Sequence, residues 1–348
     1  MSLFTGKLME WYGVNKRDLP WRGTKDPYLI WISEIILQQT RVAQGYDYFM
    51  RFVSRFPDVQ TLAEADEDEV MRYWQGLGYY SRARNLHEAA RSMGGVFPRT
   101  YEGVRALKGV GDYTAAAICS IAYGMPYAVV DGNVYRVLSR YFDMDIPIDS
   151  TGGRKVFAAL AQEMLDVRHP DTYNQAIMDF GALQCIPKSP DCSACPLADT
   201  CLAFARGRVS VLPVKQHKTK VTDRYFIYIY VRANNEMLLR KRTGDDIWRN
   251  LYELPLLEVE RPMDEREVCQ LLQDKEWMPR LGEGVTFVPL KRGLRHVLSH
   301  QVIHADFYGL ALPFLPAGLA DYVRVPIDGW GRYALPRLVH AFLEEYKI

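Results

Sequence analysis

The chain has 348 residues, of which 48% are hydrophobic and 24% charged, so its composition is that of a globular protein and its length suits two domains. Its net charge of +1 argues against a purely electrostatic DNA binder, and six cysteines are too sparse for a disulfide scaffold. Residues 1–7 show no apolar signal core, and no run approaches the ~20 apolar residues that span a bilayer. We therefore expect a cytoplasmic, monomeric protein with no membrane partner.

The first part of the chain, residues 1–205, is predicted to be mainly helical. Apolar residues recur there at helical spacing in several segments, and clusters of Gly, Pro and Asp separate these segments. The helix-like segments are 28–50, 68–74, 82–93, 113–123, 133–141 and 155–165. This pattern predicts an α-helical N-terminal domain.

Glu34 is an acidic residue in an apolar setting. Bulky apolar residues flank it in the stretch WISEIILQQT, residues 31–40. Such surroundings raise the pKa of a carboxyl group and suit a general acid. The alternative is a solvent-facing glutamate on a helix, and the residues alone leave both interpretations open.

Two glycines, Gly109 and Gly111, stand just before a predicted helix in the stretch LKGVGDYTA, residues 107–115. Glycines permit a tight turn with exposed amides, and a helix N-terminus adds a positive dipole. Together these features form a phosphate-binding site. The alternative is a simple tight turn between two helices.

Asp131 lies in the stretch VVDGNV, residues 129–134, directly before another predicted helix. One interpretation is a helix cap, since aspartate is a favoured N-cap residue. The other is a second carboxylate that works with Glu34, since pairs of carboxyl groups, one acid and one anion, are typical of enzymes that cleave glycosidic bonds. The local sequence is compatible with both.

Four of the six cysteines crowd into residues 185–201, with the spacing C-x6-C-x2-C-x5-C. Zinc sites usually combine two close pairs separated by a longer arm, whereas this segment has one close pair flanked by two single cysteines. Four thiolates from one compact loop suit a 4Fe–4S cluster, and a structural zinc loop is the alternative. The candidate ligands are Cys185, Cys192, Cys195 and Cys201.

The residue pattern changes after residue 205. Residues 206–223 are rich in Lys, Arg and Thr and are predicted to form a linker. Residues 224–231 are an aromatic and β-branched run that predicts a strand, a turn follows at Asn234-Asn235, and residues 237–240 predict a second strand. Residues 224–348 are therefore predicted to form an α+β domain.

The helical segments, the Gly-x-Gly turn and the cysteine loop together resemble the helix–hairpin–helix DNA glycosylase superfamily that contains endonuclease III. Within it, the chain resembles the adenine DNA glycosylase (MutY) family. The matching stretches are residues 19–22, 33–40, 76–86, 129–137 and the cysteine loop 185–201. The resemblance implies a helix–hairpin–helix glycosylase domain over 1–205 and a Nudix (MutT-like) domain over 224–348 that recognises 8-oxoguanine.

The resemblance implies a base-excision-repair enzyme that acts on double-stranded DNA. It would remove adenine mispaired with 8-oxoguanine or guanine by hydrolysing the N-glycosidic bond. Tyr113 stands where the lyase branch of the superfamily has a lysine that forms a Schiff base, so we expect little or no strand-cutting lyase activity. The alternatives are an endonuclease III-like glycosylase/lyase for oxidised pyrimidines and a non-catalytic DNA-binding iron–sulfur protein.

The family resemblance also implies roles for individual residues. Glu34 would protonate the adenine and Asp131 would stabilise the sugar cation, with Tyr113 and Asn133 positioning these carboxylates. The extruded base requires a pocket and a residue that fills the gap in the duplex. The pocket would be lined by Arg17, Trp21, Arg22 and Gln175, the gap would be probed by Gln39 and Tyr79, and the DNA backbone would be held by Gly109 and Gly111.

In the C-terminal domain, Ser299 and His300 match the family's Phe-Ser-His loop, with Leu298 in place of the phenylalanine. The resemblance implies that these two polar residues hydrogen-bond 8-oxoguanine, while the alternative is a polar turn between two strands. No glutamate-rich magnesium-binding helix follows Pro255 in the sequence, so we expect no pyrophosphatase activity.

Overall fold

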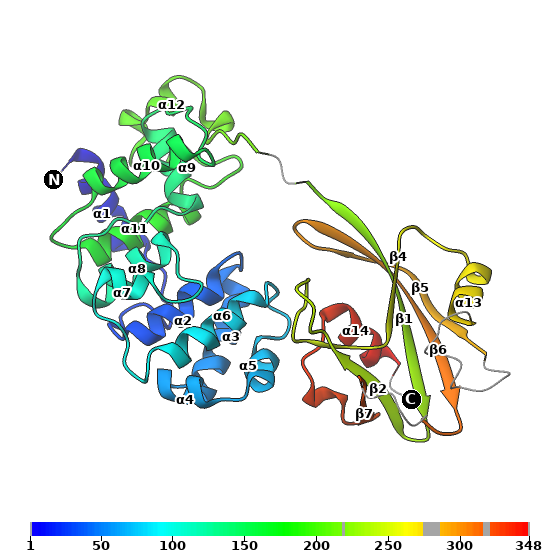
Figure 1. The fold of residues 1–348 in the computed structure, drawn as a ribbon. Coiled ribbons are helices and arrows are strands. Elements are labelled where there is room, and N and C mark those ends of the chain that lie inside the picture. The colour runs from blue at the N-terminus through cyan, green and yellow to red at the C-terminus, as the bar shows by residue number, and fades with distance from the viewer. Residues whose placement is uncertain (1, 218–219, 274–285, 316–320, 347–348) are drawn as a thin grey trace. The chain divides into compact units, whose positions relative to one another are not determined.

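The structure is a computed structural model that describes residues 2–217, 220–273, 286–315 and 321–346 (Figure 1). The chain divides into two compact units, which are described separately. Unit 1 comprises Met1–Ala65 and Arg84–Lys218, and unit 2 comprises Asp66–Ala83 and Thr219–Ile348. Within the described ranges, no helix is long and apolar enough to span a membrane.

Unit 1 is helical, as expected. Its helices are α1 (Leu3–Asn15), α2 (Pro27–Leu37), α3 (Val42–Arg55), α4 (Val59–Glu64), α7 (Tyr101–Arg105), α8 (Asp112–Tyr123), α9 (Gly132–Tyr141), α10 (Thr151–Met164), α11 (Pro170–Leu183) and α12 (Leu202–Ala205). Helix α6 (Ser81–Ser92) begins in unit 2 and continues into unit 1. The mainly helical prediction for this part of the chain is confirmed.

Helices α2 and α8 form the centre of unit 1 and carry residues that later build the site. Helix α2 buries most of its side chains, including Trp31 and Ile35, and α8 buries every residue from 114 to 121. A helix that is apolar on nearly all sides is stable only inside a protein, so both helices must be surrounded by others. Accordingly, α8 packs against both α2 and α11.

The single helix predicted over residues 28–50 is wrong. The chain leaves the helix after Leu37 and begins α3 at Val42, with Gln39 between them in the left-handed region at φ 57°. The remaining helix-like segments correspond to α6, α8, α9, α10 and α5 (Glu67–Trp74). The break places Gln39 in an exposed loop instead of on a continuous helix.

Most of the predicted linker is bound to unit 1. The carboxylate of Asp149 accepts hydrogen bonds from the backbone amides of Gln216 and His217, each at 2.8 Å. Further back, the guanidinium of Arg140 donates to the carbonyl oxygens of Val209 and Leu212. Residues 206–217 therefore follow the surface of the helical unit and do not form a free tether.

Unit 2 contains a mixed sheet with the path β3-β2-β1-β6-β5, in which β1 and β6 run parallel. Strand β4 pairs with β1 and β7 with β2, both antiparallel. The strands are β1 (Thr222–Ala233), β2 (Glu236–Lys241), β3 (Tyr252–Glu253), β4 (Leu256–Val259), β5 (Val288–Val297), β6 (Gln301–Leu312) and β7 (Val323–Pro326). The two predicted strands and the turn at Asn234 are thus confirmed.

Both faces of this sheet are buried, which explains the unbroken apolar run in β1. Ile227 and Ile229 belong to a core that includes Val268 of α13 (Glu265–Gln273). On the other face, the ring of Tyr230, which is also in β1, lies 6.0 Å from that of Phe342 in α14 (Arg337–Glu345). Alternate residues of one strand therefore face different helices, as the period of two requires.

Helix α5 is attached to the sheet unit by polar contacts. Asp68 accepts a hydrogen bond from the hydroxyl of Tyr252 at 2.9 Å and forms an ion pair with Lys241. The side chain of Gln75 accepts a hydrogen bond from the amide of Leu335 at 3.2 Å. These contacts account for the grouping of residues 66–83 with unit 2.

Candidate active site

A cavity of about 460 Å³ lies within unit 1, between the segment before α2 and the helices α2, α8, α9 and α11. The structure brings eight of the sequence-predicted residues to its wall. These are Arg17, Trp21, Arg22, Glu34, Tyr113, Asp131, Asn133 and Gln175. Residues far apart in the chain thus form one pocket that contains two carboxyl groups.

Glu34 reaches the cavity from α2 and receives a hydrogen bond from Tyr113, the second residue of α8. The Tyr113 hydroxyl donates to Oε2 of Glu34 at 2.7 Å and also lies 3.2 Å from the sulfur of Met178. Burial raises the pKa of Glu34, while the Tyr113 hydrogen bond and the positive charge of Arg22 oppose that rise. A carboxyl group whose surroundings favour its protonated form suits the role of a proton donor.

Asp131 is the N-cap of α9, which confirms the helix-cap interpretation. Its Oδ1 accepts hydrogen bonds from the amides of Asn133 at 2.9 Å and Val134 at 2.8 Å, and its Oδ2 accepts from the Asn133 side chain at 2.8 Å. Burial raises the pKa of Asp131, and these hydrogen bonds oppose the rise. The cap also fixes the carboxylate at the cavity wall, so the two interpretations of Asp131 are compatible.

Arg136 holds the Asn133 side chain from the next turn of α9, and the sequence did not single it out. It donates to Oδ1 of Asn133 at 2.8 Å and to the backbone oxygen of Cys185 at 2.7 Å. Gly181 of α11 is needed here, because a Cβ on it would lie 2.6 Å from the Cβ of Asn133. The close approach of α9 and α11 therefore depends on the absence of that side chain.

Asp179 of α11 is a second residue that sequence reasoning missed. Its side chain is fully buried and pairs with the guanidinium groups of Arg17 and Arg22. Arg22 also donates to Oε1 of Gln175 at 2.6 Å. An aspartate in the apolar stretch AIMDFG, residues 176–181, was the available signal, since an unpaired carboxylate is seldom buried.

The predicted glycine turn connects α7 to α8. Gly109 has φ 77°, and a Cβ there would lie 2.9 Å from the Cβ of Asn85, so this position requires glycine. Gly111 is the N-cap of α8, and nothing lies within 4 Å of a Cβ built on it. Both glycines are exposed, so the amides at the start of α8 are accessible to an anion.

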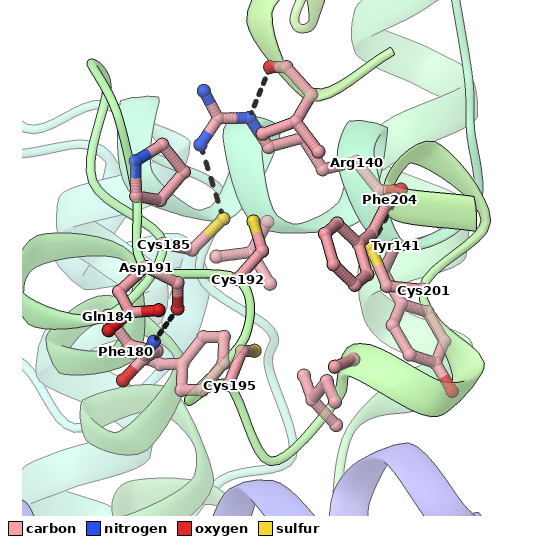
Figure 2. A pocket seen from close by; sticks show the side chains of 15 residues that line it. Arg140, Tyr141, Phe180, Gln184, Cys185, Asp191, Cys192, Cys195, Cys201 and Phe204 are labelled. Atoms are coloured by element: carbon pink, nitrogen blue, oxygen red, sulfur yellow. Dashed lines mark hydrogen bonds between the residues drawn. The ribbon is translucent and has the colours of Figure 1, made fainter. Parts of the chain in front are cut away.

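The four clustered cysteines line one cavity between α9, α11 and the segment that ends in α12 (Figure 2). Apolar side chains such as Leu197 and Phe180 complete the wall, and the guanidinium of Arg140 lies 3.4 Å from the sulfur of Cys185. Four thiols with a nearby positive charge fit a thiolate-bound group. In the arrangement that the structure describes, no three or more His, Cys, Asp or Glu side chains are grouped so that they could hold a metal ion.

The residues predicted to probe the duplex both have unusual backbone conformations. Gln39 has φ 57° in unit 1, and Tyr79 has φ 46° in unit 2. Residues other than glycine rarely adopt this conformation, and it often marks functional positions. The Tyr79 hydroxyl hydrogen-bonds the hydroxyl of Ser299, which lies with His300 in the turn between β5 and β6. The turn interpretation of residues 299–300 is therefore confirmed, and their binding role remains a prediction.

Family profiles match both units of the chain. Residues 32–150 match the HhH-GPD superfamily of base excision DNA repair proteins, and residues 227–345 match the NUDIX domain. The first match includes Glu34, Tyr113 and Asp131, and the second covers most of the sheet. These matches confirm a helix–hairpin–helix glycosylase fold followed by a Nudix fold.

Individual proteins are similar over most of the chain. An adenine DNA glycosylase of Buchnera aphidicola subsp. Baizongia pistaciae is 30% identical over 87% of this chain and 85% of the relative. An adenine DNA glycosylase of Schizosaccharomyces pombe is 36% identical over 89% of this chain and 82% of the relative. A solved thermostable thymine-DNA glycosylase is 29% identical with a TM-score of 0.55, covering 59% of this chain and 96% of that chain.

Proposed function

The chain belongs to the adenine DNA glycosylase family of base excision repair, and on this premise we propose that it removes adenine mispaired with 8-oxoguanine or guanine. It does so by hydrolysing the N-glycosidic bond and leaves the DNA strand uncut. The observation that carries this proposal is that the carboxyl groups of Glu34 and Asp131 both line one cavity. Tyr113 is hydrogen-bonded to Glu34 at the same cavity.

Glu34 acts as the general acid. Its raised pKa favours the protonated form, and the carboxyl group delivers this proton to a ring nitrogen of the extruded adenine. Protonation makes the base a better leaving group. Tyr113 and Asn133 hold the two carboxyl groups in place through the hydrogen bonds described above.

Asp131 acts as the anion that faces the sugar. As the bond to the base breaks, positive charge develops on the sugar ring, and a fixed carboxylate stabilises this charge in the transition state. Three hydrogen bonds within the α9 cap keep the Asp131 carboxylate in position without reorganisation. Water then adds to the sugar carbon that carried the base and passes a proton to the ionised Glu34, which restores the acid.

Tyr113 supports the proposal that the enzyme has no lyase activity. Strand cleavage by the related lyases requires an amine that forms a Schiff base with the sugar, and a phenol cannot do this. The hydroxyl of Tyr113 is moreover committed to Glu34. We expect an abasic site as the product.

Recognition of the mispair is assigned to Gln39, Tyr79, Ser299 and His300. The hydrogen bond between Tyr79 and Ser299 supports a shared surface, on which the aromatic ring fills the gap in the duplex while the polar loop contacts 8-oxoguanine. The exposed amides beside Gly109 and Gly111 bind a DNA phosphate. A DNA substrate is consistent with a cytoplasmic, nucleoid-associated monomer.

The four clustered cysteines would hold a 4Fe–4S cluster. The fit rests on four thiols around one largely apolar cavity and on the guanidinium of Arg140 beside the Cys185 sulfur. When bound, such a cluster ties the loop of residues 185–201 into a rigid shape. The excision chemistry itself depends on Glu34 and Asp131.

One assay tests the proposed function. The protein is incubated with duplexes that contain adenine opposite 8-oxoguanine, adenine opposite guanine, or thymine glycol. We expect strand breaks in the two adenine duplexes, and only after alkali treatment. Direct nicking of the thymine glycol duplex would instead support the lyase-type alternative.

A further inference from the structure

The Asp179 carboxylate is a fully buried charge beside the active-site cavity, with none of its side chain exposed. It accepts hydrogen bonds from Nε of Arg17 at 3.1 Å and from Nη2 of Arg22 at 2.9 Å, and a further one from Nη2 of Arg17. The backbone amide of Arg17 also donates to its other oxygen at 3.4 Å. A buried carboxylate is tolerated when it is paired in this way.

The two arginines extend from this buried anion to the cavity wall. Arg22 uses its other terminal nitrogen, Nη1, to donate to Oε1 of Gln175 at 2.6 Å and to the hydroxyl of Tyr12 at 3.3 Å. A guanidinium group has donors and no acceptor, so it contacts the oxygen of the Gln175 amide and not the nitrogen. The amide nitrogen of Gln175 is therefore the end available to a ligand in the cavity.

We propose that Asp179 is a positioning residue, which holds Arg22 so that Gln175 presents its amide hydrogens to the extruded base. This inference rests on the proposed function, because it concerns how the pocket receives adenine. Adenine offers ring nitrogens as hydrogen-bond acceptors, which complement the amide donor of Gln175. Asp179 itself is buried behind the two arginines and acts through them.

The contacts that run from Asp179 through Arg22 to Gln175 predict that the effects of substituting Asp179 and Gln175 depend on each other. A purely structural residue would not show this dependence. If Asp179 acts through Gln175, the loss of either residue removes the same contact to the base. Substitutions in one functional chain are then non-additive, whereas independent effects multiply. The quantity to measure is the single-turnover rate constant for excision of adenine opposite 8-oxoguanine.

The test uses Asp179→Asn, Gln175→Ala and the double variant in the full-length protein. We expect Asp179→Asn to lower the excision rate constant on the order of 10²-fold, since misplacement of a pocket group by about 1 Å has effects of this size. The double variant should be no slower than the slower single variant. The affinity for a duplex with a non-cleavable adenosine analogue should change by less than about threefold.

Asp171→Asn is the matched control, since Asp171 lies on the same helix, pairs with Lys25 and does not line the cavity. It should leave the rate constant unchanged. A conservative Asp179→Glu variant keeps the charge and should recover part of the lost rate. If Asp179→Asn does not fold, Gln175→Glu still tests the inference. This substitution replaces the amide donor with a carboxylate, which can only accept hydrogen bonds, so excision should be slower.

The outcomes separate the inference from the proposed function. If the unaltered protein excises adenine but the two substitutions multiply in the double variant, Asp179 has only a structural role and the inference is wrong. Full activity of Gln175→Glu would likewise contradict the orientation of the amide. If the unaltered protein excises no adenine, the proposed function fails first.

Discussion

The hydroxyl of Tyr113 lies 2.7 Å from Oε2 of Glu34 and donates a hydrogen bond to it. The two residues come from α8 and α2, the buried helices at the centre of unit 1, so the contact is held by the core of the fold. The bond stabilises the ionised form of Glu34, whereas burial favours the protonated form. The availability of the proton therefore depends on the balance between these two effects.

Replacing Tyr113 with phenylalanine should shift the pH dependence of excision. The acid form of Glu34 exists below its pKa and is lost as the pH rises through that pKa. Because the Tyr113 hydrogen bond lowers the pKa of Glu34, its removal raises the pKa, and the alkaline fall in rate should move to higher pH. Single-turnover rates measured across a pH series check this, and an unchanged or lower midpoint would contradict it.

Glu34→Gln should separate chemistry from binding. Glutamine has nearly the shape of glutamate but cannot supply the proton, so excision of adenine opposite 8-oxoguanine should fall by roughly 10²–10⁴-fold. The affinity for the mispaired duplex should stay close to that of the unaltered protein, as measured by a gel-shift or anisotropy titration. Losses of binding and activity of equal size would remove Glu34 from the role of acid.

Much of the active site could be predicted because its residues stand in local sequence motifs. Glu34, Tyr113 and Asp131 each lie next to a recognisable feature, and the structure brings all three to one cavity. The break after Leu37 could not be predicted in this way. Apolar residues continue at helical spacing across it, and the left-handed backbone of Gln39 leaves no periodic signal.

The network around Asp179 could not be predicted for a different reason. Its partners Arg17 and Arg22 are 162 and 157 positions away in the chain, and no local pattern relates an arginine to a carboxylate across that distance. Arg136 is similar, because its contact with Cys185 joins two motifs that the sequence shows separately. Such contacts depend on tertiary packing, which a single sequence does not reveal.

The glycine turn allows a comparison of two neighbouring substitutions. Gly109→Ala forces a left-handed residue to carry a Cβ that approaches Asn85, so it should lower the free energy of unfolding by roughly 1–3 kcal/mol. Gly111 has an ordinary φ of −94° and open space around a Cβ, so Gly111→Ala should lower the free energy of unfolding by less than about 1 kcal/mol. Denaturant titrations of both variants check the difference, and equal losses would contradict the steric argument.

Loss of the proposed cluster should be measurable without an activity assay. Purified protein should contain about four iron atoms per chain and absorb visible light if the four thiols bind a 4Fe–4S cluster. Cys192→Ala should reduce the iron content, while Cys119→Ala, at a buried cysteine of α8, should not. Stoichiometric zinc and no iron in the unaltered protein would favour the zinc alternative.

Substitution of both Ser299 and His300 by alanine should weaken discrimination between the bases opposite adenine. The pair is proposed to hydrogen-bond 8-oxoguanine, and loss of about 1.4 kcal/mol of such contacts corresponds to a tenfold change. We therefore expect the ratio of excision rates, 8-oxoguanine duplex over guanine duplex, to fall about tenfold, with the guanine rate nearly constant. His340→Ala, on α14 of the same unit, is the control and should preserve the ratio. If the double variant also preserves it, the β5–β6 turn does not read the opposite base, and the short contact between Ser299 and Tyr79 has a structural role instead.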